Sequence, residues 1–272
     1  YMFNGCDALE EVTIPEGITI IGNSAFRECS SLTEIVLPAS VTRIETSAFT
    51  NCTALKRVTI PDGLTYIDTE AFANCPLETA TVPALALEAI AKDTVREIVI
   101  TSGEVIKKLS PCNALESITI ADGARSIADK AFYGCYSLKD IVLPDSVTSI
   151  GKEAFYNCSS IQSIVIPAGV TSIGSGAFEN CTSLTDLTIE DGASNISQSA
   201  FTNCHIKNAV LPAYAISLFD KDKLETVDIM GGEIPDNAFD SCALLKKVTL
   251  RDGVTRIGAY AFNNCSLITE LV

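Results

Sequence analysis

The chain repeats one 23-residue unit along most of its 272 residues. One copy, from Cys29 to Cys52, reads CSSLTEIVLPASVTRIETSAFTNC. An Ala-Phe pair recurs with this step within three runs, whose phenylalanines are Phe26, Phe49 and Phe72; then Phe132, Phe155, Phe178 and Phe201; then Phe239 and Phe262. The cysteines follow the same step within three runs: Cys6, Cys29, Cys52 and Cys75; then Cys112, Cys135, Cys158, Cys181 and Cys204; then Cys242 and Cys265. A fixed period of this length predicts a solenoid, in which stacked copies share one core.

The alternation within one unit predicts a strand with one buried face. Ile35 and Leu37 lie on one side of the segment 32–37, opposite Glu34 and Val36. Pro38 ends the strand because proline cannot donate a backbone hydrogen bond to a neighbouring strand. No single unit can bury its own apolar residues, so we expect identical side chains to stack about 4.8 Å apart along the axis.

The rest of the unit turns the chain back to the next strand. An Asp-Gly pair at 62–63, 122–123, 191–192 and 252–253 predicts turns. Val41 and Ile44 form a second short extended piece, and the Ala-Phe-x-x-Cys element closes the unit.

Two longer segments, about 76–111 and 205–241, interrupt the regular period. The alanine-rich stretches 84–91 and 213–219 follow Pro83 and Pro212, which predicts a short helix in each. The two segments correspond at a fixed offset of 129 residues. We infer that a larger unit of several repeats is itself duplicated.

The spacing L-x-x-I-x-L-P-x-x-V-x-x-I-x-x-x-A-F-x-x-C resembles the BspA-like (Treponema-type) leucine-rich repeats over nearly the whole chain. This resemblance implies a right-handed leucine-rich-repeat solenoid, usually part of a large bacterial cell-surface protein. Some members are linked to adhesion to host extracellular-matrix proteins. We therefore expect an α/β-class solenoid, mostly β, with a parallel sheet on one face, about 12 rungs and two short helices, as a single domain over 1–272.

Both ends of the chain lie within a repeat. Tyr1 begins inside a degenerate Ala-Phe-x-x-Cys element, and Val272 falls inside a predicted strand. We expect a fragment of a longer protein, with the capping repeats that cover a solenoid's core outside it.

Charge and composition exclude several classes of partner. The net charge is −15 and the isoelectric point is near 4.4, so the chain lacks the basic stripe that nucleic acid or an anionic membrane requires. No run of 18 apolar residues predicts membrane insertion. The eleven cysteines are odd in number and share one column, which favours buried free thiols over disulfides.

The exposed positions of the strands form two rows. One row is mixed and acidic, and its charged members are our candidate binding residues: Glu34, Arg57, Glu97, Asp140, Asp186 and Lys247. A simply solvated face is the alternative for any one of them. The other row is β-branched, as in Val36 and Val142, and this composition suits an exposed sheet.

Catalytic and metal chemistry find little support. Glu11 and Glu34 occupy adjacent rungs at a separation similar to that of the carboxylates of retaining glycosidases, but no cleft is predicted beside them. His205 follows Cys204, which belongs to the buried column, so we interpret it as a loop histidine. No pattern of clustered ligands predicts a metal site. We expect no catalytic residue, no metal and no cofactor.

These observations favour a non-catalytic protein-interaction or adhesion module of a bacterial surface or secreted protein. We expect a monomer, located outside the cell or on its surface, that binds a host extracellular-matrix or surface protein through its sheet. A structural spacer, selected for length and stiffness, is the alternative. Glycan binding is less favoured because the chain has no tryptophan and its tyrosines are scattered.

Overall fold

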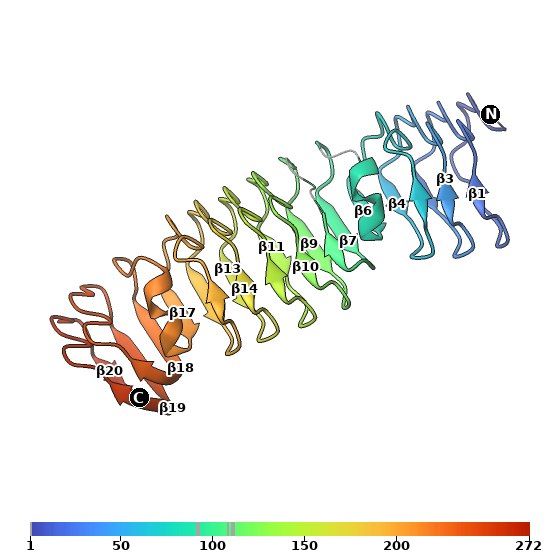
Figure 1. Ribbon diagram of the computed structural model, residues 1–272. Coiled ribbons are helices and arrows are strands. Elements are labelled where there is room, and N and C mark those ends of the chain that lie inside the picture. Colours follow the sequence, from blue (N-terminus) through green and yellow to red (C-terminus); the bar gives the residue numbers. More distant parts are fainter. Residues whose placement is uncertain (1, 91–92, 108, 110–111) are drawn as a thin grey trace.

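The computed structural model describes residues 2–90, 93–107, 109 and 112–272. Within them, the chain winds as a solenoid of about 11 turns in which each turn adds one strand to a long parallel sheet (Figure 1). This main sheet consists of β2 (Glu34–Val36), β4 (Arg57–Thr59), β6 (Thr79–Val82), β7 (Glu97–Ile100), β9 (Ser117–Ile120), β11 (Asp140–Val142), β13 (Ser163–Ile166), β15 (Asp186–Ile189), β17 (Asn208–Leu211), β18 (Thr226–Ile234), β19 (Lys247–Ile257) and β20 (Glu270–Leu271). The predicted solenoid with a parallel sheet on one face is confirmed.

The register of the main sheet follows the sequence period. Glu34 lies beside Arg57, and Ile35 lies beside Val58, 23 residues further on. The hydrogen-bonded strands form two six-stranded groups in the orders β11-β9-β7-β6-β4-β2 and β13-β15-β17-β18-β19-β20. The main sheet is therefore interrupted once among its described strands, between β11 and β13.

A second, narrower ladder runs along another side of the solenoid. Its two-residue strands are β1 (Ile20–Ile21), β3 (Arg43–Ile44), β5 (Tyr66–Ile67), β8 (Val105–Ile106), β10 (Ser126–Ile127), β12 (Ser149–Ile150), β14 (Ser172–Ile173) and β16 (Asn195–Ile196). They pair in the orders β1-β3-β5 and β16-β14-β12-β10-β8. This ladder is the second extended piece that the sequence predicts.

Each irregular segment contains the predicted helix, and both helices are of the 3₁₀ type. They are η1 (Ala84–Ala89) and η2 (Ala213–Leu218), each preceded by a proline. The amide of Ala86 donates to the carbonyl oxygen of Pro83 at 2.9 Å, the spacing of a 3₁₀ turn. The last predicted position of the first helix, residue 91, lies outside the described residues.

A glycine allows the first helix to pack against the next turn of the chain. Gly103 has a φ of +123°, and a Cβ built there would approach the Ala84 Cβ to 2.5 Å. Only glycine meets both requirements without strain. Gly232, 129 residues further on, lies in the same way beside Ala213 at the start of η2.

The predicted turn at 252–253 is wrong, whereas the other three Asp-Gly pairs lie in turns. The strand β19 continues through both residues, and Gly253 pairs with Gly231 of β18. A Cβ on Gly253 would lie 2.7 Å from the Met230 carbonyl oxygen. The absence of side chains on these two facing glycines thus lets β18 and β19 stay paired through the bend where a turn was predicted.

Stacked phenylalanine rings form the centre of the core. Successive rings from Phe132 to Phe201 have centroids 5.1–5.2 Å apart and interplanar angles of 2–13°. The same stacking runs from Phe3 to Phe72. Leu109 takes the position of a phenylalanine in the irregular segment and is fully buried. The predicted stacking of identical side chains is confirmed for the phenylalanines, and it is interrupted where the repeat becomes irregular.

The cysteine column satisfies backbone groups of the preceding turn. The Sγ of Cys158 donates to the carbonyl oxygen of Phe132 at 3.1 Å, and that of Cys181 donates to Phe155 at 3.2 Å. The cysteines are thiols and form no disulfide among the described residues. The predicted burial is wrong for Cys6, which is exposed, and for Cys265, which is half-buried, because both lie in end turns that are covered on one side only.

We predict that Phe155→Ala lowers the free energy of unfolding by about 3–5 kcal/mol, since it leaves a cavity between two rings. Phe155→Leu, which imitates the turn containing Leu109, should cost clearly less. Urea unfolding followed by circular dichroism measures both. Equal losses for the two variants, or a loss below about 1 kcal/mol for alanine, would contradict a ring-stacked core.

We also predict that stability falls as the pH rises above about 9. Burial raises the pKa of Cys204 to about 12 and of Cys242 to about 11 from an ordinary value of 9.0. Above pH 9 the unfolded chain loses these protons while the folded chain retains them, so unfolding becomes more favourable up to the folded-state pKa values.

Unfolding in urea at pH 8, 9.5 and 10.5 measures this slope. Cys204→Ala should reduce it, whereas Cys6→Ala, at an exposed position, should leave it unchanged. A slope that is identical in both variants and the parent chain would exclude the buried thiols as its cause.

Candidate functional site

The six candidate residues lie in a single row across the main sheet. Each is the first residue of its strand, namely Glu34 of β2, Arg57 of β4, Glu97 of β7, Asp140 of β11, Asp186 of β15 and Lys247 of β19. Thr79, Ser117, Ser163, Asn208 and Thr226 fill the positions between them. The six candidate side chains are exposed except that of Lys247, which is half-buried. The sheet thus aligns the six candidate residues in one row, but the row extends along the length of the sheet and does not bring them together.

Ion pairs neutralise both ends of this row. Arg57 contacts Glu34 at 3.0 Å, and Lys247 contacts Glu270 at 2.7 Å. Each pair joins neighbouring strands, and its charges are about half exposed, so it contributes little to stability. Arg57 and Glu34 therefore pair with each other, and Lys247 pairs with Glu270. These charged side chains do not converge on a common point.

The middle of the row carries unneutralised negative charge. Among the described residues, Glu97, Asp140 and Asp186 take part in no ion pair. Asp186 accepts hydrogen bonds from Asn208 Nδ2 at 2.8 Å and from the Thr185 hydroxyl at 2.6 Å, both neutral donors. The electrostatic character of the sheet is therefore acidic near its centre.

The second exposed row is apolar at three turns. Val36, Val142 and Val165 are 54%, 64% and 51% exposed. Val142 and Val165 belong to β11 and β13, the two strands that are not joined by hydrogen bonds. Exposed apolar side chains thus gather at the interruption of the sheet.

A cleft of about 230 Å³ lies at this interruption. One side is lined from β11 and the residues after it, and the other from β13 and the turns that follow: Ile141, Val142, Leu143 and Asp145 on the first side, and Ser163, Ile164, Val165, Pro167 and Glu190 on the second. The sequence placed Val142 and Val165 in an exposed row but did not indicate a cleft, since the repeat is regular here. Asp145, Pro167 and Glu190 are residues that sequence reasoning missed.

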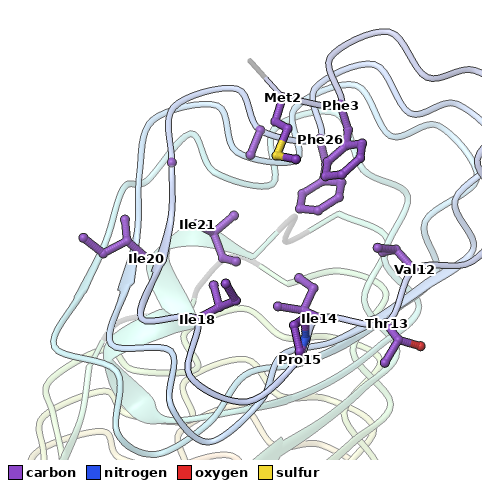
Figure 2. Close-up of a pocket in the computed structure, with 12 residues that line it drawn as sticks. Met2, Phe3, Val12, Thr13, Ile14, Pro15, Ile18, Ile20, Ile21 and Phe26 are labelled. Atoms are coloured by element: carbon purple, nitrogen blue, oxygen red, sulfur yellow. The ribbon is translucent and has the colours of Figure 1, made fainter.

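A larger apolar cavity, of about 410 Å³, lies at the N-terminal end of the solenoid (Figure 2). Figure 2 shows Phe3 beside Phe26, with Met2, Ile14 and Ile18 around the same hollow. Phe3 and Phe26 belong to the core of successive turns, whereas Met2 and Ile18 are exposed. The lining contains few polar groups, and none of its side chains is a titratable acid or base, so it lacks the convergent polar groups of an active site.

The pair Cys204–His205 does not form a nucleophile and base. The Cys204 Sγ donates to the carbonyl oxygen of Phe178 at 3.1 Å, and its burial raises the pKa of the thiol to about 12. The Nδ1 of His205 contacts the carbonyl oxygen of Thr182 at 2.9 Å on the surface. The thiol remains protonated and points into the core.

Within the described part of the chain, no group of three or more His, Cys, Asp or Glu side chains is placed to hold a metal ion. The described residues also contain no helix that is long and apolar enough to cross a membrane.

The comparison with protein families identifies the repeat. The BspA type leucine rich repeat region matches in six copies over residues 1–95, 107–222 and 232–272. The chain therefore belongs to the BspA-type leucine-rich-repeat family, as its spacing predicts. No curated protein matches the sequence significantly.

Several solved structures are similar to the chain. A leucine-rich repeat protein from Bacteroides ovatus is 25% identical, with 94% of this chain and 69% of that chain covered and a TM-score of 0.46. The T. pallidum leucine rich repeat protein is 22% identical, with coverage of 72% and 80% and a TM-score of 0.42.

A leucine rich cell surface protein from Faecalibacterium prausnitzii is 26% identical, with coverage of 96% and 85% and a TM-score of 0.31. All three TM-scores are below 0.5. The likeness transfers no function by itself.

Proposed function

We propose that the chain is a non-catalytic protein-interaction module of a bacterial surface or secreted protein, which binds a host extracellular-matrix or surface protein through its main sheet. One observation carries this proposal: a sheet of two six-stranded groups presents one continuous row of polar side chains. Repeat proteins use such extended surfaces to bind other proteins.

Charge and family support the same proposal. The row is acidic at its centre, where Glu97, Asp140 and Asp186 form no ion pair among the described residues, so a basic surface is the complementary partner. Membership of a leucine-rich-repeat family supports a protein-interaction module. Residues 1–272 then act as one domain, because one connected core joins all the turns described. The module acts as a monomer outside the cell.

Binding of purified extracellular-matrix proteins to the immobilised chain tests the proposal. We predict that Asp140→Lys and Asp186→Lys weaken binding at least about fivefold, since they reverse charges at the centre of the sheet. Lys152→Glu is the matched control, because Lys152 contacts Glu153 away from the main sheet. Surface plasmon resonance measures the dissociation constants.

Unchanged affinity in both sheet variants would place the interface on another face. The absence of binding to every protein of the panel would favour the alternative of a structural spacer.

A further inference from the structure

The interruption between β11 and β13 leaves two strand edges facing each other. The amide of Lys139 donates to the Glu116 carbonyl oxygen at 2.8 Å, and the amide of Thr185 donates to Gln162 at 3.0 Å. The corresponding bond between these two, from Gln162 to Lys139, is not formed. At the other end of the strand, Leu143 likewise does not donate to Val165, whereas Leu37 donates to Thr59 at 3.0 Å. The edges of β11 and β13 thus carry backbone groups that do not pair with each other.

The turns remain stacked behind this interruption. Phe132 and Phe155 have ring centroids 5.1 Å apart, as elsewhere in the core. On the second ladder, β12 pairs with both β10 and β14. The opening is therefore confined to the main sheet and has a rigid back, so the cleft described above is a local feature rather than a break in the solenoid.

The size and lining of the cleft indicate its occupant. Its volume of about 230 Å³ is below the ~300–1,000 Å³ of pockets for small molecules, so it suits one or two side chains. Ile141 and Ile164 line it toward the core, and Val142 and Val165 line it on the exposed face. Small aliphatic side chains match these walls.

Four carboxylates lie on or near the cleft. Asp145 and Glu190 line it, and Asp140 and Asp186 lie in the adjacent exposed row. None of the four takes part in an ion pair among the described residues. The neighbouring Lys139 contacts Glu116 at 3.1 Å instead. Lysine or arginine side chains of an occupant are the complement of this charge.

We propose that the cleft between β11 and β13 binds an extended segment of a partner protein, with small aliphatic residues at its centre and basic residues on both sides. The aliphatic side chains lie between Ile141 and Ile164, and the basic ones contact the surrounding carboxylates. Because β11 and β13 remain in contact with each other, the segment lies across the outer face of the cleft rather than between the two strand edges. This inference rests on the proposed function and names the segment that the module recognises.

Fluorescence polarisation with the labelled peptide Lys-Val-Thr-Val-Lys tests the recognition. Two peptides are controls: Glu-Val-Thr-Val-Glu reverses the charge, and Lys-Ser-Thr-Ser-Lys removes the aliphatic side chains. We expect each control peptide to bind at least tenfold more weakly than the first. Equal binding of all three peptides would overturn the proposal.

A pair of variants locates the site. Val165→Lys places a cation in the cleft and should weaken binding of Lys-Val-Thr-Val-Lys at least tenfold. Val99→Lys occupies the same row on β7, which pairs with strands on both sides, and should leave binding unchanged. Circular dichroism confirms that both variants fold. Equal effects of the two substitutions would overturn the proposal.

Hydrogen exchange then reports where the peptide covers the chain. We expect the amides of Leu143 or Gln162 to gain protection when the peptide is added, while that of Leu37 is unchanged. Protection that appears only elsewhere in the chain would overturn the proposal. So would a dimer detected by light scattering that Val165→Lys abolishes, because a second copy of the chain would then occupy the cleft.

The two proposals fail separately. If a matrix protein binds the chain but Val165→Lys leaves its affinity unchanged, the cleft is excluded and the interaction module remains. If the peptide binds as expected and no matrix protein does, the cleft remains and the proposed class of partner is excluded.

Discussion

Every feature of this protein depends on the stacking of one turn of chain on the next. A single turn has no core of its own, so Phe155 is buried only because Phe132 and Phe178 cover its two faces at 5.1 Å. The same spacing suits parallel strands, which lie about 4.8 Å apart. It also brings several cysteine thiols to a carbonyl oxygen of the turn before, as in Cys158 and Phe132. Ring stacking, strand pairing and thiol bonding therefore depend on one common distance.

Stacking also determines what the surface can do. Residues 23 apart become neighbours, so a charge in one repeat meets a charge in the next, as Glu34 meets Arg57. Where both neighbours are acidic or neutral, as around Asp140 and Asp186, the negative charge stays unneutralised. The cleft between β11 and β13 lies in this acidic region, and it combines apolar walls with unpaired strand edges.

The fold was predictable because the same core residues recur in every regular repeat. The cleft on the surface was not predictable, because that same regularity gives no local signal for it. The Ala-Phe pair, the proline and the cysteine predict strand, turn and core together, and Pro83 and Pro212 mark the helices. The exposed row containing Glu97 and its partners followed from alternation alone. The cleft depends instead on a missing hydrogen bond in an otherwise regular repeat, for which the residues around Leu143 give no local signal. The corner at Gly253 needed two facing glycines from different turns, a relation that local turn rules do not include.

The contacts between aromatic rings in solution test the stacked core most directly. With selectively labelled phenylalanine, nuclear Overhauser effects should join Phe132 to Phe155, Phe155 to Phe178 and Phe178 to Phe201, in a chain of neighbours. No effect should join Phe132 to Phe201, since two rings lie between them. Contacts that skip turns, or the absence of contacts between successive rings, would contradict a solenoid built by stacking like on like.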